Sequence, residues 1–370
     1  MKFLFTCGGT GGHIYPAVSV AEEISKKDPD TQFLFIGAEG MMEMDLVPAC
    51  GYDIKAIRVT NLSRGKSFSA LFHNLRSIFN VITAVFKAMK LIRDYGPDAV
   101  IGTGGYVCFP VIFAAHLLGI PTFLHESNSV PGLTTKMLSR YVDAVFLGYR
   151  ESMQYYPAGK AVYAGTPVRK MFEEKDESRA FEQLGTDADL PLVVSVWGSL
   201  GSGYMNECFS KFVEIMPEGK FRLLHVTGKR YFGKYGYMAD LDLPVVKNKE
   251  FITKDFIYDL PVYLSAASLV ICRAGASTLA ELAYLGKPAI IVPSPNVTNN
   301  HQDKNARVFE RKGAAIVLSE GTFTPEDLLA SIISVLSNPE KADRMSVEMS
   351  SFCVPDSAAL IAKKVLSMLR

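Results

Sequence analysis

The sequence predicts an α/β protein with two Rossmann-like, doubly wound parallel-sheet domains that face a cleft. Short apolar runs rich in β-branched and aromatic residues alternate with longer helical patterns, as is typical of parallel sheets covered by helices. The pattern also starts twice, because apolar runs lead into glycine-rich loops near residues 8 and 198. At 370 residues the chain exceeds the usual size of one core, so two domains are expected.

The expected strands form two series, one for each domain. The first series comprises residues 2–7, 33–36, 99–101, 122–125 and 144–147, and the second comprises 192–197, 221–226, 269–272, 289–292 and 314–318. Helical patterns such as 17–27, 206–214 and 278–285 lie between strands. We therefore expect a first domain at 1–169, a polar linker at 170–189 and a second domain at 190–355. A final helix in 356–370 could pack back on the first domain.

Composition restricts the possible classes of function. The formal net charge of +1 gives no general attraction to nucleic acid, so no nucleic-acid partner is expected. The six cysteines are scattered without a C-x-x-C pair, which favours reduced buried thiols over disulfides or a zinc site. Since no apolar run is long enough to span a bilayer, any membrane contact should come from one side.

Both glycine runs join an expected strand to an expected helix. Residues 8–13 and 198–203 could bring backbone N–H groups to phosphate oxygens at a helix N-terminus, where the dipole favours anions. They could also serve only as tight turns. Neither run matches a dinucleotide fingerprint and no Walker lysine follows, so NAD and ATP chemistry are not expected.

Two polar residues follow expected strand ends, where open α/β folds bind ligands. His13 could accept a proton from an attacking hydroxyl near neutral pH, or it could be a neutral helix-capping donor. Glu281 could grip both ribose hydroxyls of a nucleotide. It could equally complete a capping box in which Thr278 is the N-cap.

A basic segment separates two of the early strands. Between Ile54 and Arg93 there are eight Lys or Arg residues and no Asp or Glu. An apolar stripe at spacings of four and three predicts a long helix packed on the first sheet: Leu71, Leu75, Ile78, Ile82, Val85, Met89 and Ile92. Beside it lie aromatic and basic residues typical of a surface for anionic lipid: Phe72, Arg76, Phe79, Phe86, Lys87 and Lys90. Core packing of the three rings is the alternative.

Several short motifs together resemble the family of undecaprenyldiphospho-muramoylpentapeptide β-N-acetylglucosaminyltransferases (MurG) of bacterial peptidoglycan synthesis. The resemblance covers essentially the whole chain. The motifs are G-G-T-G-G-H-x-x-P at 8–16, G-G-Y-V at 104–107, H-E-S-N at 125–128, G-T-P-V-R at 165–169, G-S-L-G at 198–201, R-A-G-A-S-T-L-A-E at 273–281 and H-Q-x-x-N-A at 301–306. The second glycine loop departs from the family's usual G-G-S-x-G-A, since it follows Trp197 and ends in Ser202. A hydroxyl in place of a methyl leaves binding through the backbone intact.

The resemblance implies the twin-Rossmann glycosyltransferase architecture called GT-B. It also implies inverting transfer of N-acetylglucosamine from UDP-GlcNAc to the C4 hydroxyl of a muramoyl-pentapeptide carried on a polyprenyl diphosphate. It implies a peripheral enzyme at the cytoplasmic face of the cell membrane, in contact with an anionic membrane surface. His13 is the candidate base. No Asp-x-Asp pair is placed to hold a metal on the diphosphate, so we expect no obligatory metal or other cofactor.

The resemblance also assigns residues to each substrate. UDP-GlcNAc would be bound by Ser199, the Ile257 backbone, Ala276, Ser277, Thr278, Leu279, Ala280, Glu281, His301 and Gln302, and from the first domain by Thr10, Gly11, Gly12, Asn128 and Arg169. Gly9, Tyr106 and Glu126 would line the acceptor side, with Glu126 joining His13 as a catalytic candidate.

Three other functions share some of these features. A UDP-GlcNAc 2-epimerase would have the same fold and donor, but it would not need a basic helix with exposed aromatic residues. A glycosyltransferase acting on diacylglycerol would differ in its acceptor, which only an acceptor assay distinguishes. A non-catalytic sugar-nucleotide-binding subunit would bind UDP-GlcNAc without turnover, and the presence of His13, Asn128 and Glu281 together argues against it.

Overall fold

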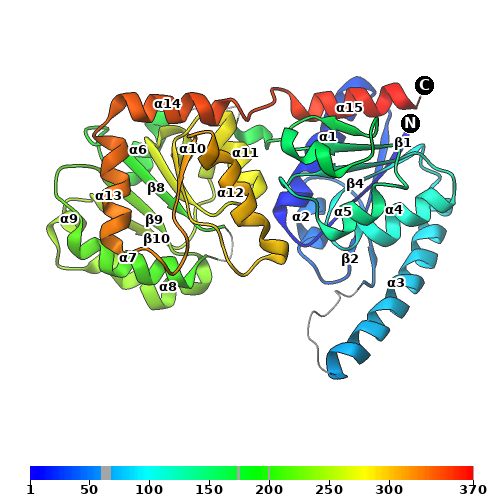
Figure 1. Cartoon of the computed structure of the whole chain (residues 1–370), viewed down its shortest axis with the longest axis horizontal. Helices are drawn as coiled ribbons and strands as arrows, with labels where there is room; N and C mark the ends of the chain where they lie inside the picture. The colour runs from blue at the N-terminus through cyan, green and yellow to red at the C-terminus, as the bar shows by residue number, and fades with distance from the viewer. Residues whose placement is uncertain (60–67, 173–175, 199–200, 370) are drawn as a thin grey trace. The chain divides into compact units, whose positions relative to one another are not determined.

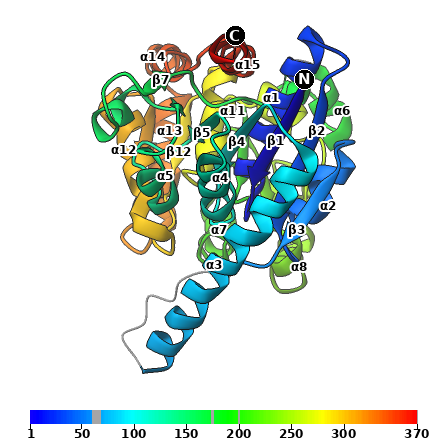
Figure 2. The same cartoon turned by 90° about the vertical axis from the view of Figure 1, so that its right-hand side faces the viewer.

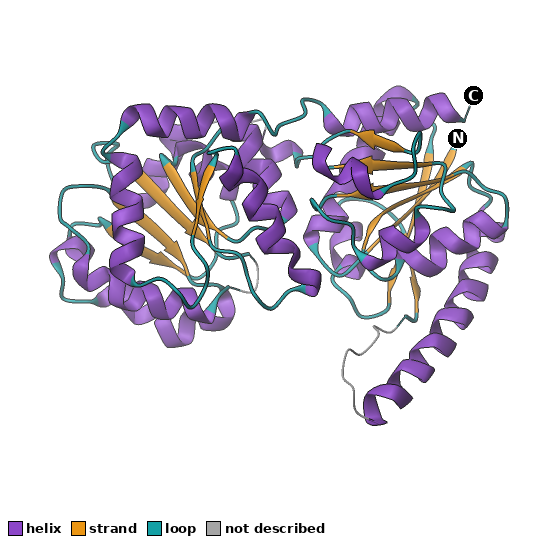
Figure 3. Cartoon of the chain, in the orientation of Figure 1, coloured by secondary structure: helices purple, strands orange, loops and turns teal. Residues whose placement is uncertain are grey.

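The computed structural model describes the backbone of residues 1–59, 68–172, 176–198 and 201–369, and the side chains of these residues except 68–79. The chain divides into two compact units. Unit 1 comprises Met1–Arg169 together with Val354–Arg370, and unit 2 comprises Lys170–Cys353. Each unit is built on a parallel sheet with helices on both faces, as Figure 1 and Figure 3 show. The expected fold class is confirmed.

Unit 1 contains a seven-stranded sheet in the order β3-β2-β1-β4-β5-β6-β7. Side chains alternate between the two faces of each strand, so Phe3 and Phe5 pack on one face and Leu4 on the other. The first face is covered by α1 (Gly11–Lys27), α2 (Glu43–Ala49) and α15 (Ser357–Met368), and the second by α3 (Phe68–Tyr95), α4 (Cys108–Leu117) and α5 (Leu133–Leu138). The strands are β1 (Lys2–Cys7), β2 (Gln32–Ala38), β3 (Ile54–Ile57), β4 (Ala99–Gly104), β5 (Thr122–Glu126), β6 (Ala144–Leu147) and β7 (Ala161–Tyr163).

Unit 2 contains a six-stranded parallel sheet in the order β10-β9-β8-β11-β12-β13. Its strands are β8 (Leu192–Val196), β9 (Arg222–Val226), β10 (Phe251–Lys254), β11 (Leu269–Cys272), β12 (Ala289–Ile291) and β13 (Ala315–Val317). Its helices are α6 (Glu177–Leu184), α7 (Gly203–Ile215), α8 (Lys229–Tyr235), α9 (Pro244–Lys247), α10 (Leu260–Ala266), α11 (Ala276–Leu285), α12 (His301–Arg311), α13 (Pro325–Leu336) and α14 (Pro339–Ser350). Residues of α7 and α13 form a core with the sheet, in which Phe209, Phe212 and Ile332 are fully buried.

Residues 170–189, expected to be a linker, instead include helix α6, which packs against α10 in unit 2. Asp176 caps the helix by accepting a hydrogen bond from the N–H of Arg179, and Gly185 ends it with a φ of 62°. Both are ordinary capping signals. The polar composition of this segment therefore reflects an exposed amphipathic helix.

Helix α3 packs on unit 1 through the C-terminal part of the predicted stripe together with two alanines. Ala84, Ala88 and Ile92 are buried, whereas Ile82 of the predicted stripe is 49% exposed. The two alanines let α3 lie close to α4, and the apolar spacing alone does not register such small contact residues. Leu71, Leu75 and Ile78 lie outside the described side chains. Among the described residues, none of the helices has both the length and the apolar character needed to cross a membrane.

The C-terminal helix α15 packs on α1 and completes the core of unit 1. Ile361, Ala362 and Val365 belong to the same apolar cluster as Ile24 of α1, and all of them are buried. The neighbouring Leu360 is 40% exposed. Helix α15 therefore contributes to the core of unit 1, although unit 2 separates it from the rest of that unit along the chain.

We predict that Ile361→Ala lowers the free energy of unfolding of unit 1 by about 2–4 kcal/mol, because it leaves a cavity between α15 and α1. Leu360→Ala is the matched control and should cost less than about 1 kcal/mol. Urea unfolding followed by circular dichroism measures the effect. Trp197, the only tryptophan, reports on unit 2 by fluorescence. Equal midpoints for the two variants would contradict this packing role.

Candidate active site

The first glycine loop connects β1 to α1 and is packed tightly against the turn after β4. Gly9 has a φ of +83°, in the left-handed region that favours glycine. The Gly8 N–H donates to the Gly104 carbonyl at 3.1 Å. A Cβ on Gly105 would lie 2.4 Å from the Gly8 carbonyl oxygen, so this close approach of two backbone segments requires glycine.

His13 lies in the first turn of α1 and is held by this loop. Its Nδ1 is 2.8 Å from the Gly8 carbonyl oxygen. A carbonyl oxygen only accepts, so Nδ1 carries the proton and Nε2 is the acceptor nitrogen of the neutral ring. A Cβ on Gly104 would come within 2.5 Å of the imidazole, so the ring lies directly against this glycine. The geometry gives His13 the tautomer that a general base acting through Nε2 requires.

Several backbone N–H groups of the first loop, which could have bound phosphate, donate to other groups of the protein instead. The Gly9 N–H donates to Oε2 of Glu43 at 3.0 Å, and the His13 N–H donates to the Thr10 carbonyl at 3.0 Å. Together with the Gly8 N–H, these groups are used within the protein. Glu43 itself was missed by sequence reasoning, since its spacing from the loop carries no recognised motif.

Glu126, at the end of β5, organises the loop that follows it. Its Oε1 accepts hydrogen bonds from the backbone and side-chain nitrogens of Asn128 at 3.1 and 3.0 Å, and its Oε2 accepts from the Gly132 N–H at 2.9 Å. The residue is 5% exposed. Because both carboxyl oxygens accept bonds from the loop, the structure favours a positioning role for Glu126 over proton transfer.

The remaining predicted residues of unit 1 lie on neighbouring loops. Tyr106 follows β4 and is half-buried, and burial together with the Glu43 carboxylate raises the pKa of its phenol. The guanidinium of Arg169 lies 5.1 Å from the centre of the Tyr15 ring. Thr10 is exposed. Loops after β1, β4, β5 and β7 thus carry these residues at the carboxyl edge of one sheet.

In unit 2, the predicted donor-binding segment forms the start of α11. The helix begins at Ala276 with Gly275 as its N-cap, so Thr278 is the third helical residue and the capping-box alternative is wrong. Gly275 adopts the extended backbone of an N-cap residue (φ −66°, ψ 131°). Thr278, three residues later, therefore lies inside the helix and does not cap it. Glu281 is 4% exposed within the second turn. The N-terminal amides of α11 suit an anionic group.

Arg273 connects the loops around α11. Its guanidinium donates to the Val292 carbonyl at 3.0 Å and to the Ser202 hydroxyl at 2.7 Å, and it lies 5.5 Å from the centre of the Trp197 ring. It also forms an ion pair with Glu320 at 2.5 Å. One side chain thus fixes the ends of β8 and β12 and the N-cap of α7.

Helix α12 is tied to the same sheet edge. The Asn305 side chain donates to the Ala274 carbonyl at 3.2 Å, and Oε1 of Gln302 accepts from the Ser294 N–H at 2.8 Å. Nδ1 of His301 donates to the carbonyl of Thr298 at 2.8 Å. His301 and Gln302 therefore hold loops in place through one end of each side chain.

The other predicted residues divide by location. Ile257 is 9% exposed in the loop between β10 and α10. Phe86, Lys87 and Lys90 are exposed on α3. Ser199 lies outside the described residues, and the side chains of Phe72, Arg76 and Phe79 lie outside the described side chains.

A buried polar chain between the elements that flank the second glycine loop was also missed by sequence reasoning. Trp197 Nε1 donates to the Ser195 hydroxyl at 2.9 Å, which lies 2.9 Å from Nδ1 of His225. Nε2 of His225 is 2.8 Å from Oδ1 of Asn206, whose amide donates to the Thr227 carbonyl at 3.0 Å. Burial lowers the pKa of His225 to about 3. The chain joins β8, β9 and α7 on either side of the loop.

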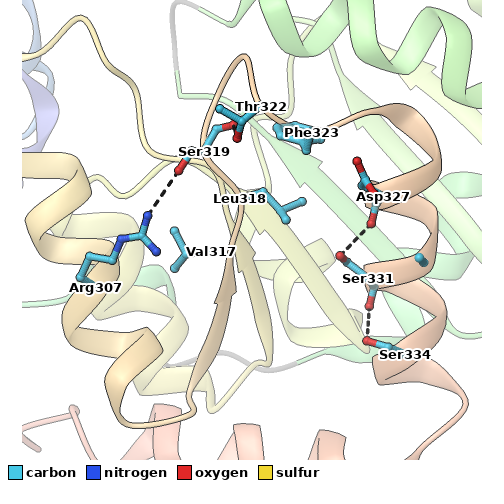
Figure 4. Close-up of a pocket in the computed structure, with 10 residues that line it drawn as sticks. Arg307, Val317, Leu318, Ser319, Thr322, Phe323, Asp327, Ser331 and Ser334 are labelled. Atoms are coloured by element: carbon cyan, nitrogen blue, oxygen red, sulfur yellow. Dashed lines mark hydrogen bonds between the residues drawn. The ribbon is translucent and has the colours of Figure 1, made fainter.

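A separate hollow lies between α12, β13 and α13 (Figure 4). Arg307 lies at its edge, but its guanidinium contacts the carboxylates of Asp303 and Glu310 and the Ser319 hydroxyl. The positive charge is thus neutralised locally. None of the predicted site residues lines this hollow.

The comparisons with known proteins cover both units. The model described as "Glycosyltransferase family 28 N-terminal domain" matches residues 3–147, and "Glycosyltransferase family 28 C-terminal domain" matches residues 192–361. The chain is 39% identical to the UDP-N-acetylglucosamine–N-acetylmuramyl-(pentapeptide) pyrophosphoryl-undecaprenol N-acetylglucosamine transferase of Listeria welshimeri, with 100% of each chain covered. The protein of the same name from Bacillus cytotoxicus is 38% identical, covering 97% of this chain and 96% of that one. The crystal structure of Acinetobacter baumannii MurG matches with a TM-score of 0.78 and 29% identity over 99% of both chains.

The buried His225 leads to a prediction about pH. Its pKa is lower in the folded state, at about 3, than the usual 6.5, so only the unfolded chain takes up this proton between those values. The free energy of unfolding should therefore fall with decreasing pH, at up to about 1.4 kcal/mol per pH unit from this residue. His225→Gln should flatten that slope between pH 6 and pH 4, as followed by Trp197 fluorescence. Above pH 7 the two curves should run parallel. Parallel curves over the whole range would contradict the assignment.

Proposed function

This chain belongs to glycosyltransferase family 28, and from that membership we propose how its residues carry out sugar transfer. It is an N-acetylglucosaminyltransferase of peptidoglycan synthesis, which moves N-acetylglucosamine from UDP-GlcNAc to N-acetylmuramyl-(pentapeptide) pyrophosphoryl-undecaprenol. The observation that carries this conclusion is 39% identity over the full length of both chains. The residue roles, the stereochemistry and the membrane contact below are our proposals.

The proposed reaction is an inverting displacement. The C4 hydroxyl of the muramoyl unit attacks the anomeric carbon of N-acetylglucosamine, a new C–O bond forms, and the bond to the UDP oxygen breaks with inversion. The hydroxyl proton passes to Nε2 of His13. Support comes from the Nδ1 contact with the Gly8 carbonyl, which makes Nε2 the acceptor in the neutral ring. Gly9 and Tyr106 would contact the acceptor, and Glu126 would keep the loop that follows it in shape.

The proposed donor site is centred on the start of α11. Negative charge develops on the diphosphate as the bond breaks, and the N-terminal amides of Ala276–Leu285 would stabilise it. Glu281 would bind the ribose hydroxyls and the Ile257 backbone the uracil. The other donor contacts that we propose are Thr10, Gly11, Gly12, Asn128, Arg169, Ser199, Ser277, Thr278, Leu279, Ala280, His301 and Gln302.

We also propose that the enzyme works at the cytoplasmic face of the membrane, docked through α3. An acceptor whose polyprenyl tail stays in the bilayer must be met at the surface. Ile82 and Phe86 are 49% and 66% exposed one helical turn apart, and Lys87 and Lys90 are exposed on the same helix. Figure 2 shows α3 extending away from the sheet of unit 1. Exposed apolar side chains beside cations suit an anionic lipid surface.

The test of the reaction is incubation with UDP-GlcNAc and a short-chain muramoyl-pentapeptide diphosphate acceptor, followed by product mass. His13→Ala should reduce kcat by about 10²–10⁴-fold, because the attacking hydroxyl loses its base. The affinity for UDP-GlcNAc should change little. His116→Ala, an exposed histidine on α4, is the control and should leave turnover unchanged. Full turnover with His13→Ala would exclude His13 as the base.

The test of docking uses anionic vesicles and two paired variants. Ile82→Ser with Phe86→Ser should weaken binding at all salt concentrations, since apolar insertion is insensitive to salt. Lys87→Glu with Lys90→Glu should weaken it at low salt by about tenfold or more, at about 1 kcal/mol per basic residue, with the difference fading at high salt. Val347→Ser in α14 and Lys363→Glu with Lys364→Glu in α15 are matched exposed controls. Binding of both α3 variants as tight as the controls would place docking elsewhere.

A further inference from the structure

We propose that Glu43 is a positioning residue, which holds His13 in its working tautomer through the peptide group that joins Gly8 and Gly9. This inference rests on the proposed function of His13 as the base. Glu43 is the first residue of α2 and is fully buried. Its Oε2 accepts from the Gly9 N–H and its Oε1 from the Ala38 N–H, both at 3.0 Å.

The two contacts of the loop belong to one rigid peptide group. The Gly9 N–H and the Gly8 carbonyl are the two polar ends of the same planar amide. Glu43 binds one end at 3.0 Å, and Nδ1 of His13 binds the other at 2.8 Å. Since the plane is rigid, fixing the N–H fixes the direction of the carbonyl. A carboxylate at the N–H also polarises the amide, which strengthens the bond that the carbonyl accepts.

Two glycines make room for the Glu43 side chain. A Cβ on Gly8 would lie 2.6 Å from Oε1 of Glu43, and a Cβ on Gly37 would lie 2.6 Å from its Cγ. Gly37 belongs to β2 and Gly8 to the loop after β1, so the carboxylate fits between the ends of two adjacent strands. The site is thus shaped around this side chain.

In a hydrolase triad a carboxylate orients the catalytic histidine by direct contact. Here the carboxylate of Glu43 would orient His13 through the peptide group that lies between the two side chains. It also gives the first glycine loop a purpose other than phosphate binding. The amide of Gly9 orients the histidine, and the buried negative charge beneath it disfavours an anion at that point.

The test compares Glu43→Gln with the matched control Glu250→Gln. Glu250 is a buried carboxylate in unit 2 that accepts from the Gly219 N–H at 2.9 Å. Glutamine cannot accept on both sides, so one of the two N–H donors at Glu43 would face an NH₂ group. We expect Glu43→Gln to lower kcat by about 10–100-fold, because the base is misplaced. The KM for UDP-GlcNAc should stay within about twofold of the parent value. Glu250→Gln should affect only the melting temperature.

Two further readouts separate positioning from a general loss of stability. The acid limb of the kcat/KM profile should move to lower pH in Glu43→Gln, because the imidazolium loses part of the acceptor that stabilises it. Nitrogen NMR of the labelled imidazole should show His13 shifting from the Nδ1–H tautomer toward a mixture. An unchanged acid limb and an unchanged tautomer would overturn the proposal, whatever happens to the melting temperature.

A double-mutant cycle tests the same contact from Gly37. Gly37→Ala alone should displace Glu43 and reduce kcat. In a Glu43→Ala background the added methyl meets only the flexible end of the Ile54 side chain, whose Cδ1 lies 2.9 Å away, and should cost little more. Strict additivity of the two effects on kcat would count against the proposal.

The parallel His13→Ala assay separates the hypothesis about Glu43 from the hypothesis about His13. If His13→Ala abolishes turnover while Glu43→Gln behaves as Glu250→Gln, only the inference about Glu43 fails. If His13→Ala retains turnover, the proposed base fails as well.

Discussion

The candidate site of unit 1 depends on the close approach of two backbone segments, the loop after β1 and the turn after β4. Because Gly105 lacks a side chain, its backbone can lie against Gly8, and because Gly104 lacks one, the His13 ring can lie against it. Glu43 then binds the loop from below. A site of this kind tolerates very little change in volume, since Gly8, Gly104 and Gly105 each face a neighbour that a single methyl group would displace.

The two units fix the glycine loop that follows their first strand with side chains of different charge. Both place their candidate residues in loops after parallel strands, where the carboxyl ends meet at one edge. In unit 1 a buried carboxylate secures the glycine loop. In unit 2 a neutral chain through His225 joins the elements that flank the loop, and the charged Arg273 donates to the hydroxyl of Ser202. The cation lies beside the loop that we propose binds the anionic diphosphate. The anion lies beside the loop that we propose holds the base, which becomes positively charged when it accepts a proton.

Much of the fold and the main motifs could be predicted, because they depend on local sequence. Apolar runs and glycine turns indicate strands and loops from windows of about ten residues. The motifs between residues 8 and 306 carry the resemblance to the family. Glu43 and His225 could not be found in this way, since Glu43 binds Gly9, 34 residues away, and His225 contacts Ser195, 30 residues away. Local spacing was also misleading at Thr278, where Gly275 takes the cap. On α3 it missed the two alanines of the contact face and included the exposed Ile82. The roles of the site residues remain proposals.

The return of α15 to unit 1 has a consequence for the order in which the protein folds during synthesis. Residues 170–353 form one continuous unit, but the core of unit 1 lacks Ile361 and Val365 until α15 has also left the ribosome. Unit 2 can therefore complete its core first, which reverses the usual order in which N-terminal domains fold before later ones. Until then, the apolar face of α1 stays partly uncovered, and a polypeptide stalled before residue 354 would present it to chaperones and proteases.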